Sequence, residues 1–503
     1  MAGTLWIDIE DLFHYTRVHA RPSGIQRVAF EISRTLHARC GMGGTVRFVR
    51  YDPVHNSFRI VEWTEVETAF HTLTEEARTP PETRFSGDAA RHTAARRFVR
   101  LLVYRLPESL HFQVRNALVA QDRAFRSWAH LFAALAHGLC HAPRRLAKKL
   151  CRRKAFVTES GNSESRRSES SFAAVVAAGD TLLTLGAFWS HPDYAALIEK
   201  HRARFGLRYA LLVYDIIPLR RPEWCERNFV WMFRDFFDRI VPVCDTILTI
   251  SEATAADVMA YMREQDMALS GPVVPVPMGS GFGSGRPAGM MPRSDRLPPA
   301  GSYVLFVSTI EARKNHALMF RVWRRLLEEL QQEVVPTLVF AGRIGWLVDD
   351  LMRQIANADY LDGKIIVLED PNDTELAALY QGCQFTVFPS LYEGWGLPVT
   401  ESLSFGKPCL IADRTSLPEA GGDLVRRFDP EDLNAAFAAV REIILDPKGL
   451  DRWEERIKRE FRPVPWSASA DALLAALGYG ATRNMMAGST CSAMALTEAV
   501  ADR

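Results

Sequence analysis

The sequence contains no apolar run long enough to span a membrane, no closely spaced pair of cysteines and no excess of charge of one sign. A transmembrane helix needs about 20 mainly apolar residues, so we expect none here. Residues 1–13 (MAGTLWIDIEDLF) lack a basic segment followed by an apolar stretch, and we therefore expect no signal peptide. The formal net charge of +1 gives the chain as a whole no bias towards nucleic acids or other polyanions.

The cysteines are spread along the chain without a C-x-x-C pair. This distribution is typical of reduced thiols in a cytosol and argues against a structural zinc site. We therefore expect a cytoplasmic protein, and whether it also attaches to the inner face of a membrane stays open. The eight cysteines are Cys40, Cys140, Cys151, Cys225, Cys244, Cys383, Cys409 and Cys491.

The length and composition are those of a globular enzyme with two or three domains. The chain has 503 residues, of which 48% are hydrophobic and 24% charged. Short apolar runs that end in turns recur at 181–185, 209–217 and 246–251. Such a pattern, with helical segments between the runs, predicts a doubly wound α/β sheet, in which ligands bind at the carboxyl ends of the strands.

Residues 391–406 (LYEGWGLPVTESLSFG) form the most informative stretch of the chain. They follow an apolar run at 385–390 (FTVFPS) that predicts a buried strand. Gly394, Gly396 and Pro398 end this strand, and a helix is expected directly after them. Pro398 suits the first helical turn, where an N–H has no partner to lose. The stretch is therefore a strand, a glycine-rich loop and a helix N-terminus, a combination that binds phosphate.

Two carboxylates flank this loop. Glu393 lies within it, and Glu401 falls in the first turn of the expected helix. Carboxylates are poor ligands for phosphate, but they accept hydrogen bonds from sugar and ribose hydroxyls. Two glutamates alone are most often solvated side chains. With E-G-W-G-L-P around them they predict a phosphate site with hydroxyl sites on both sides, as a nucleotide sugar requires.

The spacing Glu393–x7–Glu401 around G-W-G-L-P resembles the donor site of retaining glycosyltransferases of family four. That resemblance implies the GT-B fold, an α/β architecture in which two Rossmann-like doubly wound domains face each other across a cleft and a crossover helix ends the chain. It implies that Glu393 contacts the sugar hydroxyls and Glu401 the ribose hydroxyls. The amides of Gly396 and Leu397 would contact the diphosphate, with Gly394 in the same donor loop.

A second segment follows the apolar run at 303–309 (YVLFVST). Arg313 and Lys314 stand at the start of a helix that Asn315 is expected to cap. A forked arginine and a point-charge lysine can hold a diphosphate and stabilise it as it leaves. E-x-R-K-N resembles the family's diphosphate-binding segment, although many members have arginine where this chain has Thr309. Either Arg313 supplies that charge here, or the site carries one cation fewer.

The loop at 22–27 (PSGIQR) is a cleft candidate in the N-terminal half. Residues 13–27 are expected to be a loop that opens a helix. Gly24 allows a ligand to approach the backbone, and Arg27 can reach an anion. The motif S-G-I-Q-R resembles the N-terminal loop of a bacterial branch of the same family, which faces the phosphates and the acceptor.

Two further candidates come from the N-terminal half. Asp215, in Y-D-I-I-P-L-R, either orients the acceptor or the sugar, or caps the following turn. The family often has a histidine before this aspartate, but Tyr214 stands there, so no catalytic histidine is expected at that point. His191, in GAFWSHPDY, is a weaker candidate for the acceptor side.

The remaining loops of the second half provide weaker signals. Arg343 follows a predicted strand and is a candidate contact for a phosphate or the base. Asp373 or Thr374 is expected to cap a helix. Asp349 and Asp350 look superficially like a metal-binding pair, but they lie in an apparent helix, so we interpret them as surface residues. Enzymes of the GT-B fold generally need no metal in the site, and we expect no metal ligands and no cofactor.

Composition and motifs predict the domain boundaries. The stretch 279–301 has ten Gly or Pro in 23 residues and is expected to be a linker. The predicted organisation is an acceptor-binding Rossmann-like domain at 1–278 with a basic insertion at about 91–170, the linker at 279–301, a nucleotide-sugar-binding Rossmann-like domain at 302–463, a crossover helix at 464–480 and a flexible tail at 481–503.

Residues 91–154 differ in charge from the rest of the chain, with fifteen Lys and Arg against two acidic residues. Leucines and aromatic residues are interleaved with the basic ones. A basic amphipathic segment can lie on an anionic membrane surface. A solvated helical insertion packed on its own domain explains the pattern equally well. No nucleic-acid partner is expected, because nothing nearby resembles a known reader module.

The resemblance implies a retaining glycosyltransferase that acts on a surface polysaccharide or oligosaccharide. In this interpretation Glu393, Arg313, Lys314 and Asp215 are the catalytic residues, and a departing diphosphate oxygen helps to take the acceptor proton. The bacterial branch that the motifs resemble often transfers mannose or rhamnose. The expected partners are a nucleotide-sugar donor, with GDP-mannose as the best single guess, and a lipid-linked glycan acceptor. The alternatives are a nucleotide-sugar-binding scaffold without turnover and an epimerase of the GT-B fold.

Overall fold

The computed structural model describes residues 3–17, 19, 21–40, 45–53, 55–74, 172–189, 191, 193–268, 270–280 and 296–479. The basic segment 91–154, the polar stretch 159–171, residues 281–295 of the predicted linker and the predicted tail therefore lie outside the described residues. None of the described helices has the length and apolar content that crossing a lipid bilayer requires.

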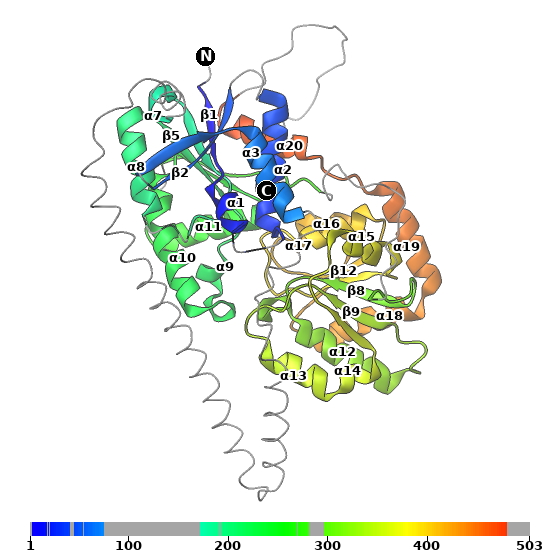
Figure 1. Cartoon of the computed structure of the whole chain (residues 1–503). Helices are drawn as coiled ribbons and strands as arrows, with labels where there is room; N and C mark the ends of the chain where they lie inside the picture. The colour runs from blue at the N-terminus through cyan, green and yellow to red at the C-terminus, as the bar shows by residue number, and fades with distance from the viewer. Residues whose placement is uncertain are drawn as a thin grey trace, which may run out of the picture. The chain divides into compact units, whose positions relative to one another are not determined.

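The described residues form two sheets, and the first has seven strands in the order β3-β2-β1-β4-β5-β6-β7 (Figure 1). Neighbouring strands run parallel except for β2 and β3, which form an antiparallel pair. The strands are β1 (Leu5–Asp8), β2 (Val46–Asp52), β3 (Ser57–Val61), β4 (Thr181–Thr184), β5 (Arg208–Val213), β6 (Thr246–Thr249) and β7 (Val273–Pro275). The accompanying helices are α1 (Glu10–Tyr15), α2 (Gly24–Cys40), α3 (Trp63–Thr74), α7 (Phe172–Val175), α8 (Tyr194–Phe205), α9 (Ile217–Arg220), η2 (Pro222–Trp224), α10 (Arg227–Ile240), η3 (Val241–Val243) and α11 (Glu252–Glu264).

The second sheet has six strands, all parallel, in the order β10-β9-β8-β11-β12-β13. The strands are β8 (Tyr303–Val307), β9 (Thr337–Ala341), β10 (Ile365–Leu368), β11 (Thr386–Phe388), β12 (Cys409–Ala412) and β13 (Arg426–Phe428). The helices of this half are η4 (Ala312–Lys314), α12 (His316–Glu329), α13 (Asp349–Asn357), α14 (Asp359–Asp362), α15 (Asp373–Gly382), α16 (Leu397–Ser404), α17 (Leu417–Gly421), η5 (Gly422–Leu424), α18 (Leu433–Leu445) and α19 (Pro447–Glu460).

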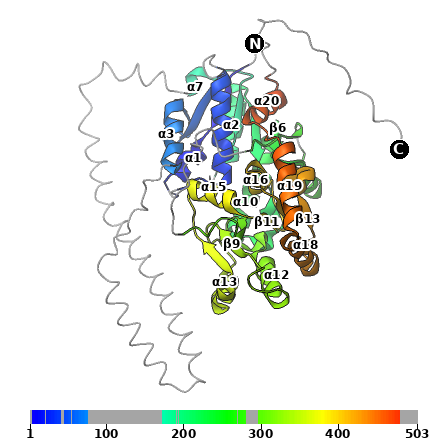
Figure 2. The same ribbon diagram turned by 90° about the vertical axis from the view of Figure 1, so that its right-hand side faces the viewer.

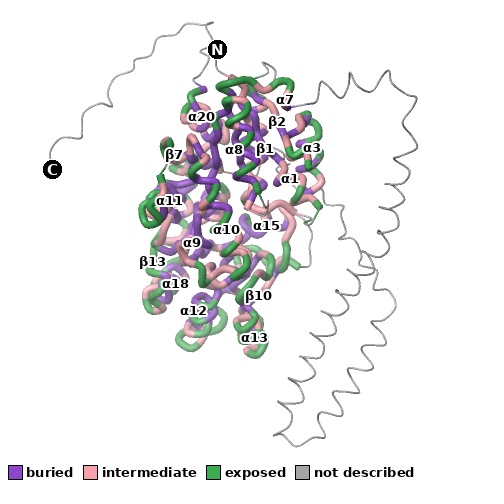
Figure 3. Tube along the Cα trace, turned by 90° about the vertical axis from the view of Figure 1, so that its left-hand side faces the viewer, coloured by how far each residue is buried: buried purple, intermediate pink, exposed green. Residues whose placement is uncertain are grey.

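Both sheets are covered on both faces, because alternate side chains of a strand point to opposite sides. In β1, Leu5 and Ile7 belong to one buried cluster and Trp6 to another. In β9, Leu338 and Val339 likewise belong to different clusters. Figure 3 shows buried residues gathered along the strands and exposed ones on outward helices such as α13. The predicted fold class, two doubly wound Rossmann-like α/β units, is confirmed.

The last described helix, α20 (Trp466–Ala476), packs on the first sheet although it follows the second in the chain. Figure 2 shows the chain passing from α19 to α20, and α20 lies near α2 in Figure 1. Ala470 and Leu473 are buried in the same cluster as Leu5 and Ile7 of β1. The hydroxyl of Ser469 donates to the carbonyl of Pro277 at 2.6 Å, which ties this helix to the end of the first half.

The N-terminal loop is shorter than expected. Residues 13–27 were predicted to form one loop, but α1 occupies Glu10–Tyr15 and α2 begins at Gly24. The reason lies at the end of β1, where the side chain of Asp8 accepts a hydrogen bond from the amide of Glu10 at 3.0 Å. This bond turns the chain directly into a helix, and a carboxylate two residues before a short helix was not part of the predicted pattern.

Two predicted helix caps differ in the structure. Asn315 occupies the N-cap position of α12, as expected, but its side chain makes no capping hydrogen bond. It adopts a left-handed conformation with φ of 63°, and its side-chain Nδ2 donates to the carbonyls of Pro389 and Pro430. Helix α15 is capped by Asn372 rather than by Asp373 or Thr374. Asn372 accepts from the amide of Glu375 at 2.7 Å while the Glu375 side chain accepts from the amide of Asn372 at 3.0 Å, a reciprocal arrangement that the neighbouring residues cannot make.

Candidate active site

The strand order of the second sheet brings two loops together. Strands β8 and β11 are neighbours at the point where the order reverses direction, and ligands of such sheets bind there, beyond the carboxyl ends of the strands. The element η4, with Arg313 and Lys314, follows β8, and the loop 391–396, with Glu393, follows β11. The topology therefore joins the two sequence motifs, which are about eighty residues apart, at one edge of the sheet.

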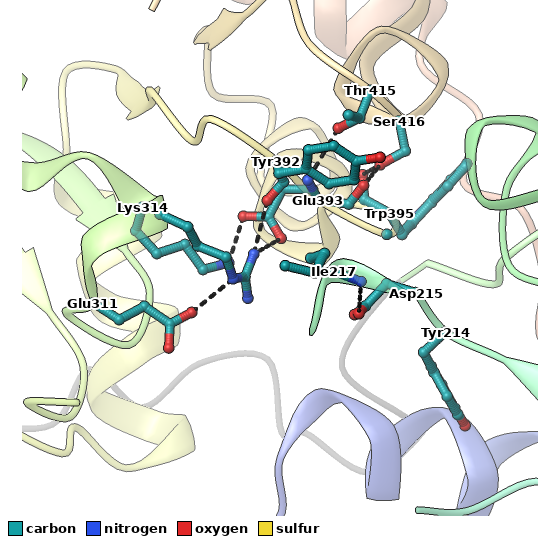
Figure 4. Close-up of polar contacts among 12 residues, drawn as sticks. Tyr214, Asp215, Ile217, Glu311, Lys314, Tyr392, Glu393, Trp395, Thr415 and Ser416 are labelled. Atoms are coloured by element: carbon teal, nitrogen blue, oxygen red, sulfur yellow. Dashed lines mark hydrogen bonds and ion pairs between the residues drawn. The ribbon is translucent and has the colours of Figure 1, made fainter. Parts of the chain in front are cut away.

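Glu393 lies at the centre of this site and is only 7% exposed. One of its carboxylate oxygens accepts a hydrogen bond from the guanidinium of Arg313 at 2.8 Å, and the other contacts the ammonium of Lys314. Figure 4 marks these contacts of Glu393 with dashed lines and also labels Lys314 and Glu311. The Nε atom of Arg313 forms an ion pair with Glu311 at 2.9 Å, so this arginine lies between two carboxylates.

The charges of these side chains perturb one another. Burial opposes the ionised form of Glu393, but the Arg313 and Lys314 charges outweigh it and lower the pKa of Glu393 to about 2. Burial and the adjacent Arg313 charge lower the pKa of Lys314 despite its contact with Glu393. Burial raises the pKa of Asp215, which the Arg313 charge partly offsets. Perturbed groups of this kind are concentrated at functional sites more than elsewhere.

The loop that carries Glu393 is held by hydrogen bonds from the segment after β12. The amide of Glu393 donates to the hydroxyl of Thr415 at 3.0 Å, and the hydroxyl of Ser416 donates to the carbonyls of Glu393 and Trp395, each at 2.9 Å (Figure 4). On its other side the loop touches the first half. A Cβ atom at Gly394 would lie 2.1 Å from the carbonyl oxygen of Tyr214, so only glycine fits this approach.

Helix α16 begins as the sequence suggested, with Gly396 at its N-cap and Pro398 in its first turn. Gly396 has a φ of 113°, which a residue with a side chain rarely adopts. Glu401 lies one turn into the helix, and its carboxylate accepts a hydrogen bond from the hydroxyl of Tyr380 at 2.9 Å. The tyrosine orients this carboxylate towards the same cavity that Glu393 borders.

A cavity of about 440 Å³, which we call the donor cavity, is lined by residues of both halves. Twelve of the thirteen predicted site residues line it, which is the strongest structural support for the sequence motifs. They are Gly24, Arg27, Asp215, Thr309, Arg313, Lys314, Arg343, Glu393, Gly394, Gly396, Leu397 and Glu401.

His191 is the predicted site residue that does not line the donor cavity. Its ring packs edge-on against Tyr51 at 4.7 Å between centroids, and its Nδ1 atom accepts from the amide of Asp193 at 3.3 Å. Burial lowers the pKa of His191, so the ring is held neutral over a wider pH range. The structure therefore separates this histidine from the other candidates.

Two predicted residues have partners that the sequence did not indicate. Arg27 forms an ion pair with Asp373 at 2.5 Å, across the donor cavity. Asp215 accepts a hydrogen bond from the amide of Ile217 at 3.0 Å and so takes part in the turn before α9, while it also borders the cavity. Both interpretations of Asp215 that the sequence left open are therefore compatible with its position.

Sequence reasoning missed the residues that position others. Glu311 lies within the E-x-R-K-N motif, but no role was predicted for it. Thr415 holds the Glu393 loop, and Tyr380 holds Glu401. Glu311 could have been found from the sequence, because it stands two residues before Arg313 and a buried cation needs more than one partner.

This arrangement can bind a diphosphate and polar rings together. Two cations and a helix N-terminus lie at one place, and carboxylates that accept hydrogen bonds lie on either side of it. Because Arg313 and Lys314 are already paired with Glu393 and Glu311, a bound anion shares these cations with the acids instead of meeting bare charges. The geometry suits a ligand whose hydroxyls reach the carboxylates.

Comparison with known proteins is consistent with this chemistry. Residues 292–460 match the family model "Glycosyl transferases group 1". The chain is similar to O-antigen chain mannosyltransferase B from Escherichia coli, with 27% identity over 280 residues, which are 53% of this chain and 69% of that protein.

A second relative is the serotype-specific mannosyltransferase WbdA from Escherichia coli, 27% identical over 293 residues. The match covers 56% of this chain, but the chain spans only 35% of that protein. Among solved structures, an α,α-trehalose-phosphate synthase from Burkholderia xenovorans has a TM-score of 0.46 and 13% identity, over 59% of this chain and 72% of that one.

Proposed function

We propose that the protein transfers a sugar from a nucleotide-sugar donor to a glycan acceptor, with retention of the anomeric configuration. The match of residues 292–460 to the family model "Glycosyl transferases group 1" supports this proposal. The observation that carries the proposal is the meeting of Glu393 with Arg313 and Lys314 at the edge of the donor cavity. These residues come from two motifs that the sequence alone associates with a donor sugar and its diphosphate.

The proposed roles follow from the position of each group. Arg313 and Lys314 hold the diphosphate, with the amides of Gly396 and Leu397 at the start of α16. Glu393 accepts hydrogen bonds from the donor sugar. Glu401, whose carboxylate Tyr380 orients, accepts hydrogen bonds from the ribose.

The proposed reaction takes place on one face of the sugar. The bond from the anomeric carbon to the diphosphate oxygen breaks, and a bond to the acceptor oxygen forms on the same face. The acceptor proton passes to the departing phosphate oxygen, so no protein nucleophile is needed. Arg313 and Lys314 stabilise the negative charge that develops on the leaving group. We propose no metal ion and no cofactor for this reaction.

We further propose mannose as the sugar, GDP-mannose as the donor and a lipid-linked surface polysaccharide or oligosaccharide as the acceptor. The names of the two Escherichia coli relatives, both mannosyltransferases, support the sugar. The loop that carries Gly24 and Arg27 borders the donor cavity, in keeping with its resemblance to the bacterial polysaccharide branch of the family.

The test is a transfer assay with purified protein. A panel of GDP-, UDP- and dTDP-sugars is supplied with and without a bacterial lipid extract, in the presence of EDTA, and the released nucleoside diphosphate is measured. We expect release from GDP-mannose that the lipid extract increases and that EDTA leaves unchanged. Loss of release in EDTA would contradict the metal-independent mechanism.

The control for this assay is Glu455→Ala, which alters an exposed carboxylate on α19. This variant is expected to retain full release, whereas Glu393→Ala and Lys314→Ala are expected to lose at least about 100-fold, as removal of a group that stabilises a developing charge typically does. No release from any donor, with thermal stabilisation by one nucleotide, would contradict the transferase and favour a binding protein without turnover. Release that needs no acceptor and yields an isomerised sugar would favour an epimerase.

A further inference from the structure

A second cavity adjoins the donor cavity. Its volume is about 330 Å³, and we call it the aromatic cavity after the side chains that line it. The charged residues Asp215, Glu311 and Arg313 line both cavities and so mark the passage from one to the other. The uncharged residues that line both are Ser23, Ile25, Tyr214 and Thr309. Nothing in the proposed donor site uses the space beyond them.

The walls of the aromatic cavity come mainly from the first half. Helix α10 contributes Phe229 and Phe233 on one of its faces, and Trp224 of η2 stands beside them. The ring of Trp346, from the segment between β9 and α13, lies 6.2 Å from that of Phe229 and closes the cavity from the second half. Trp346 is 45% exposed, so it presents apolar surface that a bound group can cover.

Polarity is distributed unevenly along this cavity. The charged residues that line it, Asp215, Glu311 and Arg313, all lie at the passage to the donor cavity. Deeper in, the Cys225 thiol is neutral near pH 7, because burial and the Asp215 charge raise its pKa to about 11. Tyr214 lines both cavities and so lies at the passage, where its hydroxyl already donates to the carbonyl of Leu185 at 2.7 Å.

This distribution discriminates between possible occupants. A sugar ring placed among the phenylalanines and tryptophans would leave several hydroxyls without partners, and each buried hydroxyl without a hydrogen bond is costly. A hydrocarbon chain loses nothing there and gains from leaving water. A polar group attached to the chain would remain at the passage, beside Asp215 and Arg313 and next to the donor cavity.

We infer that the aromatic cavity binds the hydrocarbon part of the acceptor, an alkyl or prenyl chain whose attached sugar lies at the passage beside Asp215. This inference rests on the proposed function for the identity of the head group, because only a transferase needs an acceptor hydroxyl next to the donor. It names an amphiphilic glycoside as the acceptor class and assigns the hydrocarbon part of that acceptor a binding site in the protein itself.

The test measures binding without turnover. Isothermal titration of the purified full-length protein uses methyl, butyl, hexyl and octyl α-mannosides below their micelle concentrations. We expect the dissociation constant to fall about threefold for each added methylene group, as burial of apolar area predicts, until the cavity is full. A hexyl glucoside is expected to show the same gain over its methyl counterpart. Equal affinity from methyl to octyl, or affinity that grows with the number of sugars instead, would overturn the inference.

Two positions on α10 provide a matched pair of variants. Phe229 lines the aromatic cavity, whereas Trp231, two residues along the same helix, is 72% exposed and does not line it. We expect Phe229→Ala to weaken octyl mannoside binding at least tenfold and to leave methyl mannoside binding unchanged. Trp231→Ala is expected to change neither. Equal losses in both variants would place the chain on the outer face of α10 and refute the cavity as its site.

A filling variant covers the case in which Phe229→Ala does not fold. Cys225→Leu adds volume to the cavity wall at a half-buried position, and it is expected to weaken octyl more than butyl mannoside binding. Uniform binding of both ligands to this variant would count against the inference. The binding series and the transfer assay test different claims. If affinity rises with alkyl length but no transfer occurs, the proposed function alone is contradicted. If transfer occurs but affinity does not depend on alkyl length, this inference alone is contradicted.

Discussion

Arg313 and Lys314 are the residues on which the proposed chemistry depends, and neither presents a bare charge. Arg313 pairs with Glu393 and Glu311, and Lys314 pairs with Glu393. Burying a cation without a partner costs several kcal/mol of folding free energy, so these carboxylates allow the two cations to remain charged and buried in the site. The same pairing means that an arriving diphosphate shares the cations with Glu393, and the donor sugar then provides the hydroxyls that this carboxylate accepts.

Replacing Glu393 by glutamine separates these two roles. We expect Glu393→Gln to reduce kcat at least about 100-fold, because the neutral amide is a weaker acceptor for the sugar hydroxyls and does not stabilise the positive charge that develops on the sugar ring as its bond to the diphosphate breaks. We expect the affinity for a nucleoside diphosphate to stay the same or increase, because the two cations lose a competing carboxylate. Transfer assays and isothermal titration measure the two effects.

The comparison for this variant is Lys314→Ala, which should weaken nucleoside diphosphate binding. A loss of nucleotide affinity in Glu393→Gln, accompanied by a lower melting temperature, would assign Glu393 a purely structural role. Because burial and the Arg313 charge lower the pKa of Lys314, we also expect nucleotide binding by the unmodified protein to weaken as the pH rises towards that lowered pKa.

The ionisation of Asp8 is coupled to folding. Its carboxylate, 1% exposed, accepts hydrogen bonds from the Tyr194 hydroxyl at 2.7 Å and from the amide of Glu10 at 3.0 Å. Burial raises its pKa from 3.8 to about 7, against these hydrogen bonds. Between those two values the folded protein holds a proton that the unfolded chain has released, so stability falls as the pH rises through this window and is level above it.

Substitution of Asp8 by asparagine should remove this dependence. Below the unfolded-state pKa of 3.8 we expect Asp8→Asn to be close to the unmodified protein in stability, because the Asp8 carboxyl is protonated there in both the folded and the unfolded protein. At about pH 8 the variant should be the more stable of the two, since it has no charge to bury. Thermal melts of both proteins across this range measure the difference, and parallel stability profiles would show that Asp8 ionises without a penalty.

At the scale of elements, the turn from β11 into α16 is the unit that the sequence described best. The apolar run, the glycine-rich loop and Pro398 predicted a strand, a phosphate loop and a helix start, and the structure has these elements in that order. The backbone at Gly396 explains why glycine is needed in this turn: its φ is 113°, and its Cα lies against the side chain of Leu417. An added Cβ would lie 2.7 Å from the side chain of Leu417.

Gly396→Ala should therefore damage the site as well as the fold. We expect a loss of about 1–2 kcal/mol in stability from the left-handed backbone, and a larger loss of donor affinity because the amides at the start of α16 shift. Gly363→Ala is the matched control, since Gly363 has a φ of 77° with no atom within 4 Å of an added Cβ. This control should lose stability with unchanged donor affinity, as titration and thermal melts can establish. Unchanged donor affinity in folded Gly396→Ala would exclude the α16 amides from the phosphate site.

Element boundaries were less predictable than element types. The run 209–217 suggested one strand, but β5 ends at Val213 and α9 begins at Ile217. Asp215 accepts from the amide of Ile217 and so starts the turn. An apolar run continues through such a turn because both the strand and the short helix are buried, and periodicity alone does not distinguish them.

At the scale of the whole molecule, contacts between the two halves shape the donor cavity. Arg27 of α2 pairs with Asp373 at the start of α15. The carboxylate of Glu419 accepts hydrogen bonds from the amides of Glu252 and Ala253, at 2.9 and 2.8 Å. These amides start α11, where a negative charge is favourable. Each of these pairs joins residues more than a hundred positions apart, which no local pattern indicates.

The basic segment 91–154 lies outside the described residues, and its role stays a prediction from composition. If it lies on anionic lipid, changing Arg144, Arg145, Lys148 and Lys149 to glutamine should reduce binding to vesicles that contain anionic lipid, by about 1 kcal/mol for each charge near the surface. Sedimentation with vesicles measures this. Neutralisation of four exposed arginines elsewhere is the control and should have a smaller effect. Suitable positions are Arg321, Arg324, Arg353 and Arg459. Full vesicle binding by the neutralised segment would favour a solvated insertion.

The sequence by itself determined the fold class, the donor motifs and twelve of the residues that line the donor cavity. Apolar runs, glycines and capping prolines act over a few neighbouring residues, and their conformational preferences are therefore legible in the chain. Glu393 and Glu401 were found in this way, because their spacing and their loop are local features.

Only the tertiary structure decided which of these groups meet. The strand order brings η4 beside the loop 391–396, which pairs Glu393 with Arg313 and Lys314. It excludes His191 from the donor cavity and forms the aromatic cavity from α10 and Trp346. The physical reason is that ion pairs and apolar cavities depend on distances in space, which strand order and burial determine and which sequence separation does not encode.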